Sequence, residues 1–301
     1  MSTPLVTGII TTYKRTPEMV VRAAKSILNQ TYSNMELFVV DDSPADYQLR
    51  DAVRDGLLAI GDDRLTYIRH EKNMGACAAR NTGIQASKGE FISFLDDDDE
   101  WAENKIEKLM EKMTSPEVGL VYCGHSVINE NNGTVSERKC KQSAGYVFDE
   151  LMFSNFIGST SFPLIRRECF DKVGLFDTEQ LSLQDYELWM RITKVYKVDY
   201  VDLPLIKYYV HAGEQITSNP NKQIQGNERF NMLHRKYLKK HPKANAIRQL
   251  SLVVPYARKK KYFRSLTKLV KGTLLNPLDY KNYTHKARGF MSCLLKPQNN
   301  K

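Results

Sequence analysis

The sequence of 301 residues has few cysteines and no long apolar run. No two of the five cysteines form a Cys-x-x-Cys pair, which argues against a disulfide framework or a thiolate zinc site and favours a reducing compartment. The first residues have neither a basic nor a long apolar segment, so we expect no export signal. No apolar run approaches the roughly 20 residues that span a bilayer, and the mean hydropathy is −0.47. These absences exclude a polytopic membrane protein.

The net charge of +9 hides an uneven distribution of charged residues. Residues 221–301 contain 20 lysines or arginines but only two acids, Glu228 and Asp279, whereas residues 1–220 contain 24 bases and 33 acids. The composition changes near Pro220. We therefore expect an acidic domain over residues 1–220 and a basic helical region over residues 221–301.

The first part of the chain alternates between short apolar segments and segments with helical periodicity. We expect strands over 5–11, 35–40, 65–69 and 91–95, and helices over 17–30, 45–59, 75–87, 102–114 and 185–195. Thr16-Pro17 and Ser43-Pro44 have the order typical of helix starts. This alternation predicts an α/β fold with a doubly wound, mostly parallel sheet. Ligands of such sheets bind beyond the carboxyl ends of the strands.

Four consecutive aspartates, Asp96 to Asp99, follow the strand expected at 91–95. Their carboxylates would repel one another unless a cation neutralises some of them. A solvated helix N-terminus is the alternative explanation, because acids are favourable in the first turn. The position of the run at the ligand edge of the sheet instead favours oxygen ligands for Mg²⁺ or Mn²⁺, completed by substrate phosphates.

Two other strand ends carry candidate binding residues. Asp41 and Asp42 follow the strand at 35–40, where they fit either a turn before a helix or contacts to a ribose or base. Tyr13 follows the first strand and has a ring suited to stacking on a base. Both interpretations remain open from the residues alone.

Eight short segments, in order along the chain, carry a family resemblance. They are Ile9–Tyr13, Ser26–Tyr32, Glu36–Ser43, Asn73–Gly75 with Ala79–Ile84, Gly89–Leu95 with the acidic run, Ile165–Arg167, Gly174–Asp177 and Asp185–Arg191. In these segments the chain resembles the inverting glycosyltransferases of family 2, of the type that builds bacterial surface glycans. The resemblance covers about residues 4–215. It implies a GT-A-like mixed, mostly parallel sheet, with a C-terminal helical extension that matches nothing known to us.

The resemblance implies a nucleotide site at the sheet edge. Thr11, Tyr13 and Asp42 fall where the family binds the uridine of a nucleotide sugar. Arg80 falls where the family contacts the nucleotide. The implied donor substrate is therefore a UDP-sugar.

The resemblance also implies a metal site. Asp96 and Asp98 fall on the Asp-x-Asp motif of the family, whose first Asp faces the ribose and whose second coordinates Mn²⁺ or Mg²⁺. Asp97 takes the variable middle position, and Asp99 is expected to support the ligands. His211 falls where many members place a residue that touches the metal or the diphosphate.

The catalytic base implied by the resemblance is Asp185, which falls on the Asp of a Glu-Asp pair. Gln184 stands where the family commonly has Glu, which leaves the base carboxylate intact but removes a neighbouring charge. Residues 158–161 are expected to line the acceptor side. Trp101 and Trp189 are expected to be packing residues.

The resemblance implies transfer of a single sugar, with inversion, from a UDP-sugar to a hydroxyl of a glycan or lipid-linked glycan. Processive members carry a Gln-x-x-Arg-Trp motif, which this chain lacks. A sugar-1-phosphate nucleotidyltransferase is an alternative, although such enzymes open with a Gly-rich loop and Gly8 lies within a strand. A nucleic-acid-binding protein is a second alternative, since aromatic residues interleave with bases over 259–264. The joint presence of Asp42, Asp96, Asp98 and Asp185 argues against it.

The basic region predicts a membrane contact. Residues 228–240 and 258–275 combine basic residues with apolar stripes, a pattern typical of helices in a membrane interface. The stripes contain Phe230, Leu233, Tyr237 and Leu238 in the first segment, and Tyr262, Phe263, Leu266, Leu269, Val270 and Leu274 in the second. We expect a cytoplasmic enzyme held at the inner face of the cell membrane by anionic lipid. Packing of the stripes on the catalytic domain, or a homodimer contact through them, is the alternative.

Overall fold

The computed structural model describes residues 3–130, 132–210 and 219–295. The chain forms two compact units. The first comprises Met1–Thr178 and Leu188–Ala212, and the second comprises Glu179–Glu187 and Gly213–Lys301. No helix within the described ranges has the length and hydropathy needed to cross a bilayer.

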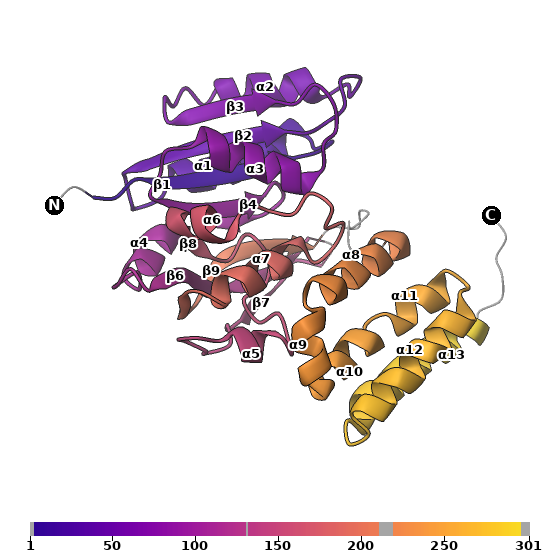
Figure 1. Ribbon diagram of the computed structural model, residues 1–301. Helices are drawn as coiled ribbons and strands as arrows, with labels where there is room; N and C mark the ends of the chain where they lie inside the picture. Colours follow the sequence, from indigo (N-terminus) through magenta and orange to yellow (C-terminus); the bar gives the residue numbers. More distant parts are fainter. Residues whose placement is uncertain (1–2, 131, 211–218, 296–301) are drawn as a thin grey trace. The chain divides into compact units, whose positions relative to one another are not determined.

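The first unit is built on one mixed sheet (Figure 1). Its strands pair in the order β3-β2-β1-β4-β8-β6-β9-β5, and β7 pairs with β6. The strands β1 to β4 run parallel, while β8 is antiparallel to both β4 and β6. The bounds are β1 (Val6–Thr12), β2 (Met35–Asp41), β3 (Leu65–Arg69), β4 (Phe91–Asp96), β5 (Glu100–Trp101), β6 (Val118–Asn129), β7 (Thr134–Arg138), β8 (Leu164–Arg166) and β9 (Lys197–Val210). The expected mostly parallel α/β sheet is confirmed.

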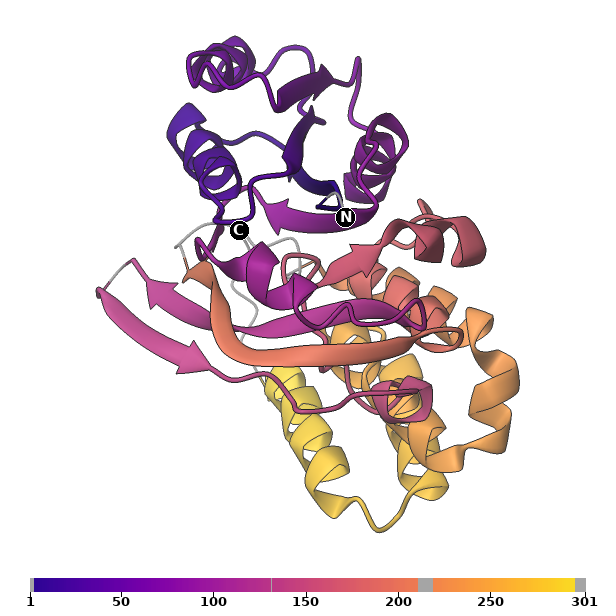
Figure 2. The same cartoon turned by 90° about the vertical axis from the view of Figure 1, so that its left-hand side faces the viewer.

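Helices cover both faces of the parallel part of the sheet, and Figure 2 shows α1 and α3 on opposite sides of it. Val6 and Ile10 pack in one core with apolar residues of α1 and α2, whereas Ile9 points to α3. A Cβ at Gly83 of α3 would lie 2.7 Å from Ile9 Cγ2, so only glycine allows this approach. The bounds are α1 (Pro17–Leu28), α2 (Arg50–Leu58), α3 (Ala76–Ala86), α4 (Lys105–Met110), α5 (Phe148–Leu151), α6 (Arg167–Val173) and α7 (Gln184–Thr193), the last of which begins in the second unit.

Two expected helices are shorter than predicted. The helix expected over 45–59 begins at Arg50, because residues 44–50 form turns in which Tyr47 N–H donates to the Pro44 carbonyl and Arg50 N–H to that of Tyr47. The helix expected over 102–114 spans Lys105–Met110, because Glu100 and Trp101 pair with β9 and Ala102 N–H donates to the Leu205 carbonyl.

Helices make up most of the second unit over residues 220–295. Their bounds are α8 (Pro220–Leu233), α9 (Arg235–Lys240), α10 (Pro242–Leu250), α11 (Val253–Arg258), α12 (Tyr262–Leu275) and α13 (Tyr280–Leu295). The segment expected as a helix over 228–240 is divided at His234, and its Phe230 and Leu238 are buried. In α12, by contrast, Phe263 is 80% exposed and Leu274 is 76% exposed. The two expected apolar stripes therefore have different surroundings.

Candidate functional site

The sheet brings several predicted residues to one edge. Thr11 of β1 is in register with Val40 of β2 and with Asp96 of β4, so the carboxyl ends of these strands are adjacent. Asp42 follows β2 directly. From α3, the Nη2 atom of Arg80 lies 3.4 Å from Asp96 Oδ1. Thr11, Asp42, Arg80 and Asp96 thus gather at the edge where ligands of parallel sheets bind.

The carboxylate of Asp42 is buried and fully engaged by the protein. Its Oδ1 accepts hydrogen bonds from Met74 N–H at 2.7 Å and from His70 Nδ1 at 2.8 Å, and its Oδ2 accepts one from Gly75 N–H at 2.8 Å. Gly75, at φ +91°, is the residue before α3. Asp42 therefore fixes the loop that leads into the helix bearing Arg80.

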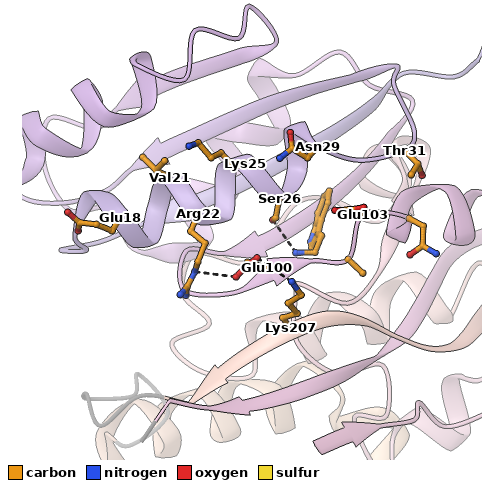
Figure 3. A pocket seen from close by; sticks show the side chains of 13 residues that line it. Glu18, Val21, Arg22, Lys25, Ser26, Asn29, Thr31, Glu100, Glu103 and Lys207 are labelled. Atoms are coloured by element: carbon orange, nitrogen blue, oxygen red, sulfur yellow. Dashed lines mark hydrogen bonds and ion pairs between the residues drawn. The ribbon is translucent and has the colours of Figure 1, made fainter. Parts of the chain in front are cut away.

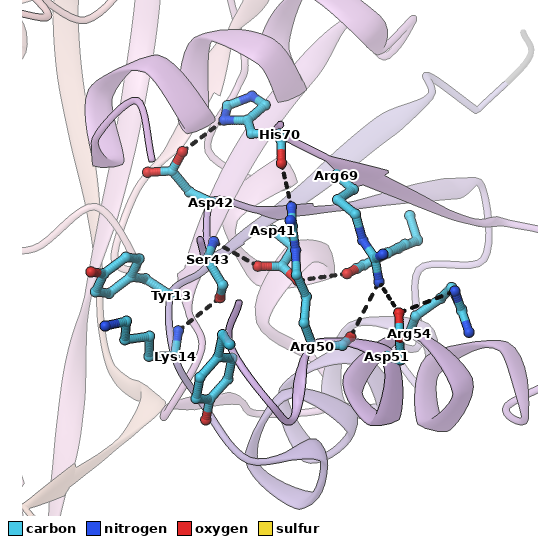
Figure 4. A network of polar contacts seen from close by, with 12 residues as sticks. Tyr13, Lys14, Asp41, Asp42, Ser43, Arg50, Asp51, Arg54, Arg69 and His70 are labelled. Atoms are coloured by element: carbon cyan, nitrogen blue, oxygen red, sulfur yellow. Dashed lines mark hydrogen bonds and ion pairs between the residues drawn. The ribbon is translucent and has the colours of Figure 1, made fainter. Parts of the chain in front are cut away.

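The neighbouring Asp41 joins β2 to three other segments (Figure 4). Its carboxylate accepts hydrogen bonds from Ser43 N–H at 2.8 Å and from the Tyr67 hydroxyl at 2.6 Å, and lies 3.5 Å from Arg50 Nε. Burial, reinforced by the hydrogen bond to Asp41, raises the pKa of Tyr67 to about 12. Arg50 also donates to the His70 carbonyl. Asp41 and Arg50 thus hold the strand ends beneath the site.

Backbone hydrogen bonds hold the loop after β1 on two sides, while the ring of Tyr13 in this loop stays accessible. Lys14 N–H donates to Ser43 Oγ at 2.8 Å, and Tyr13 N–H donates to Asp97 Oδ2 at 3.3 Å. Lys14 has φ +54°, a left-handed conformation that turns the chain sharply. The side chain of Tyr13 is 45% exposed, so its ring is available for stacking.

Arg15 neutralises part of the acidic run. Its Nε lies 2.9 Å from Asp97 Oδ1 and its Nη2 lies 2.6 Å from Asp98 Oδ2. Burial raises the pKa of Asp97 to about 6, although Arg15 acts in the opposite direction. Arg15 was not among the residues predicted from the sequence. The available signal was its place in the loop after β1, at the same sheet edge as the aspartates.

Asp99 is the most deeply buried member of the run, with no exposed surface. Its Oδ1 accepts a hydrogen bond from Tyr209 N–H at 3.1 Å, while its buried Oδ2 has no hydrogen-bond partner among the described residues. Burial, together with the charges of Asp96 and Asp98, raises the pKa of Asp99 to about 9. The surroundings of Asp99 thus oppose its ionisation, while the other aspartates of the run present oxygen donors of the type that suits a divalent cation.

Within the described ranges, no three His, Cys, Asp or Glu side chains converge as metal ligands. Completion of the ligand set of a cation at Asp98 by substrate phosphates stays a prediction. His211, expected to add a ligand, lies outside the described residues. The hydrogen bond from Tyr209 N–H to Asp99 joins β9 to the acidic run, and Tyr209 is two positions before His211 in the sequence.

Residues expected to line the acceptor side contact the first aspartate of the run. Ser159 Oγ and Thr160 Oγ1 lie 3.2 and 3.4 Å from the Asp96 carboxylate, and Asp96 N–H donates to Ser161 Oγ at 3.0 Å. The loop from 158 to 161 therefore orients Asp96 opposite Arg80.

The predicted base, Asp185, lies in the second unit. It is partly exposed at the start of α7, one residue after Gln184, and its Oδ1 accepts a hydrogen bond from Tyr186 N–H at 2.7 Å. Trp101 and Trp189 are buried, as expected for packing residues, and Trp189 Nε1 donates to the Gly158 carbonyl.

A hollow of about 820 Å³ lies between α1 and the segment around β5 (Figure 3). None of the predicted site residues lines it. Arg22 connects it to the acidic run, since Arg22 Nη2 donates to the Asp98 carbonyl at 2.9 Å and Arg22 Nε lies 3.5 Å from Glu100. The guanidinium of Arg22 also lies 4.0 Å from the Tyr209 ring centroid. Arg22, which the sequence analysis missed, thus holds the backbone of the run.

Comparison with known proteins identifies the family. The sequence model for glycosyl transferase family 2 matches residues 7–174. The chain belongs to this family. Among its relatives is WcaA of Escherichia coli K12, whose name provisionally assigns it to colanic acid biosynthesis as a glycosyl transferase. It is 31% identical over 279 residues, which cover 89% of this chain and 93% of WcaA. The family excludes the nucleotidyltransferase alternative.

A second relative has a more detailed name. The Escherichia coli protein WfgD, named a UDP-Glc:alpha-D-GlcNAc-diphosphoundecaprenol beta-1,3-glucosyltransferase, is 31% identical over 201 residues, or 66% of this chain and 75% of WfgD. A solved structure, the mannosyltransferase PcManGT of Pyrobaculum calidifontis in complex with GDP-Man and Mn²⁺, has a TM-score of 0.60 at 18% identity. The match covers 97% of this chain and 86% of that one. It shows that this glycosyltransferase has a GT-A-like fold.

Proposed function

We propose that this glycosyltransferase uses a UDP-sugar and a divalent cation, and transfers one hexose with inversion to a hydroxyl of a glycan or lipid-linked glycan. The observation that carries the proposal is the gathering of Thr11, Asp42, Arg80 and Asp96 at one sheet edge. Beside them, one carboxylate oxygen of the acidic run has no hydrogen-bond partner within the part of the chain that the structure describes. The name of WfgD, with its UDP-glucose donor and lipid-diphosphate acceptor, supports the choice of donor and acceptor.

The proposed nucleotide site uses the edge of β1, β2 and β4. The exposed ring of Tyr13 stacks on the uracil, and Thr11 and the Asp42 loop border the base and ribose. Because both oxygens of Asp42 already accept protein hydrogen bonds, its contribution includes holding the loop in shape. The guanidinium of Arg80 supplies positive charge toward the nucleotide, and Asp96 faces the ribose.

The proposed metal ligands are Asp98 and His211, completed by the diphosphate of the donor. When bound, Mn²⁺ or Mg²⁺ would offset the negative charge that develops on the leaving UDP. Arg15 partly neutralises Asp98, and the buried Asp99 holds β9 next to the run through Tyr209.

Asp185 is the proposed general base. It accepts the proton of the acceptor hydroxyl while the hydroxyl oxygen bonds to the anomeric carbon from the face opposite UDP. The bond between that carbon and the phosphate oxygen breaks with its electrons remaining on UDP. Gln184 leaves this carboxylate without the acidic neighbour common in the family.

We also propose that residues 1–220 form the catalytic domain and that residues 221–301 attach the enzyme to a membrane. The attachment surface is the outer face of α12, where Phe263, Leu266, Val270 and Leu274 are 80%, 47%, 50% and 76% exposed. Arg264 and Lys271 belong to the same helix, and Lys259 to Lys261 precede it. This combination fits an anionic membrane surface, where a lipid-linked acceptor would be found.

The experiment that tests the function is a donor panel of UDP-sugars and GDP-mannose, scored by nucleotide release and by thermal shift, with Mn²⁺ and with excess chelator. We expect one UDP-sugar to be hydrolysed slowly without acceptor, to stabilise the protein, and to lose both effects in chelator. Turnover of GDP-mannose alone would overturn the UDP assignment, and full activity in chelator would overturn the metal.

A further inference from the structure

The short segment that carries Asp185 belongs to the helical second unit. Residues Glu179–Glu187 group with the C-terminal helices, whereas the rest of α7, from Leu188, groups with the sheet. We propose that α8 and α10 position the catalytic base, and that Gln180, Gly226 and Arg248 are positioning residues for it. This inference rests on the proposed role of Asp185.

The side chain of Gln180 ties the segment to α8. It is 1% exposed, and its Nε2 donates to the Ser182 carbonyl at 2.6 Å and to the Gly226 carbonyl at 2.8 Å. One amide group therefore both closes the turn before Asp185 and fastens that turn to the middle of α8. Loss of this donor would remove a hydrogen bond from the part-buried Ser182 carbonyl and from the buried Gly226 carbonyl.

Gly226 lets the two backbones come into contact. A Cβ at this position would lie 2.5 Å from the Ser182 carbonyl oxygen and 2.7 Å from the Ser182 nitrogen, distances that real Cβ atoms do not reach. Ser182 Oγ also donates to the Lys222 carbonyl at 3.0 Å, one turn earlier on α8. Arg229, one turn later, forms an ion pair with Glu179. The segment therefore lies along about two turns of α8.

On the other side of Asp185, an aromatic stack holds Tyr186. The Tyr186 ring stacks on Phe230 of α8, with centroids 4.8 Å apart and an interplanar angle of 27°. The Arg248 guanidinium of α10 lies 5.3 Å from the Tyr186 ring centroid and 5.2 Å from that of Phe230. All three side chains are at least 90% buried. Since Arg248 Nε and Nη1 have no hydrogen-bond partner in the described ranges, the two ring faces contribute to the orientation of this cation.

The backbone between these two attachments is in an unfavourable conformation. Leu183 has φ +61°, which side-chain-bearing residues rarely adopt. Such a conformation persists only where surrounding contacts hold it, and it is most frequent at functional sites. Here the contacts of Gln180 and Ser182 lie before Leu183, and the stack of Tyr186 lies after it. Asp185 therefore takes its place between two anchors on the C-terminal helices.

The test compares Gln180→Met with Gln249→Met. Gln249 is a matched control, since it is a buried glutamine of the same unit whose Nε2 donates to Asn245 rather than to the segment. The measurements are kcat for nucleotide release from the best UDP-sugar, Kd for UDP with Mn²⁺, and amide hydrogen exchange of residues 183–187. We expect Gln180→Met to lower kcat about 10-fold to 100-fold, as misplacement of a catalytic group does, with Kd unchanged and faster exchange. The control should keep kcat within about twofold.

A second pair of variants covers the case in which Gln180→Met fails to fold. Arg248→Met removes the cation above Tyr186, and Arg248→Lys keeps one. We expect the lysine variant to recover a substantial part of the kcat that the methionine variant loses. Equal kcat for the two, or a loss of UDP affinity that accompanies every loss of kcat, would overturn the positioning role.

Asp185→Asn, measured in parallel, distinguishes a wrong base assignment from a wrong positioning role. If it retains kcat, the base assignment is wrong and the positioning inference falls with it. If it loses kcat while Gln180→Met and Arg248→Met do not, the base stands and only the positioning inference is wrong.

Discussion

The Nη2 atom of Arg15 lies 2.6 Å from Oδ2 of Asp98. The guanidinium thus occupies one oxygen of the carboxylate that we propose as the metal ligand, and its Nε reaches Asp97 as well. A divalent cation and Arg15 would therefore share the charge of the same aspartate. If Asp98 is the metal ligand, as we propose, Arg15 should affect how strongly the site binds metal.

Arg15→Met should lower the stability of the metal-free protein by about 1–3 kcal/mol, because the buried Asp97 loses a charged partner. The same change should strengthen Mn²⁺ binding, because Asp98 no longer shares its charge. Thermal unfolding with increasing Mn²⁺ measures both effects. The control is Arg54→Met, which breaks exposed pairs on α2 and should shift stability by less than about 0.5 kcal/mol. Weaker Mn²⁺ binding by Arg15→Met would contradict this explanation.

Asp98→Asn should abolish nucleotide-sugar turnover and the Mn²⁺-dependent part of UDP binding, because the diphosphate loses its counter-charge. Calorimetric titration of UDP with and without Mn²⁺ gives the result directly. Glu111→Gln, which removes an exposed acid paired with Lys108, should behave like the native protein. If Asp98→Asn still bound UDP more tightly in Mn²⁺, the ligand would have to be sought elsewhere in the run.

Asp185→Asn should preserve UDP binding and lower sugar transfer by about 10²–10⁴-fold, the usual contribution of a positioned base. Steady-state kinetics with the natural acceptor or, without it, hydrolysis of the donor measures the loss. Glu187, two residues away and 3% exposed, is the nearest alternative carboxylate. Native transfer by Asp185→Asn together with an inactive Glu187→Gln would move the base to that residue.

The double variant Phe263→Ser and Leu274→Ser should weaken binding to anionic vesicles at least tenfold, since each exposed side chain contributes about 1.5–3 kcal/mol when buried. Flotation with vesicles of anionic and neutral lipid, at low and high salt, measures the change. Leu58→Ser, on the 60% exposed Leu58 of α2, is the matched control and should have no effect. Failure of the native protein to float, with a concentration-dependent dimer lost in the double variant, would instead support the homodimer contact.

Lys105 gives the protein a pH-dependent stability. Its side chain has no exposed surface, its Nζ lies 2.6 Å from Ser93 Oγ, and burial lowers its pKa to about 7. Between pH 7 and the ordinary lysine value of 10.5, the unfolded chain binds a proton that the folded protein does not. Stability from this group therefore rises with pH across that window and is lost as pH falls toward 7.

The variant Lys105→Met removes this titration, so its Tm relative to the native protein should fall steadily from pH 7 to pH 9.5. Calorimetry at several pH values measures the difference. Lys108→Met, on an exposed residue of the same helix, should show no such trend. A pH-independent gap between native protein and Lys105→Met would mean that Lys105 has its ordinary pKa.

The parallel part of the sheet was predictable because its strands are continuous apolar runs followed by helix signals. Strands β5 to β9 do not show this pattern of an apolar run and a helix start. Strand β9 also contains Pro204, beside a register shift in its pairing with β6. The start of α2 was misplaced because Ser43-Pro44 opens a turn fixed by Asp41, whose carboxylate accepts Ser43 N–H. The local sequence is compatible with a helix start or with a turn at Ser43-Pro44, and the contact with Asp41 selects the turn.

The candidate site was predictable where chemistry is local. The acidic run could be recognised because its four aspartates are adjacent in the sequence. Arg15, Arg22 and His70 were missed because their partners lie 28 to 83 positions away and depend on which strands are neighbours. The grouping of Asp185 with α8 likewise depends on contacts such as Gln180 to Gly226, 46 positions apart.

The hydrogen bond from Tyr209 to Asp99 joins residues 110 positions apart. Contacts of such long range form late, because closure of the intervening chain must be compensated before they stabilise anything. During synthesis, the ribosome releases the acidic run long before β9 emerges. The nascent enzyme therefore carries its proposed metal-binding loop unfinished while the next 110 residues are made. A chain truncated before β9 would expose that loop without its last support, which makes the end of β9 the point at which translation completes the active edge.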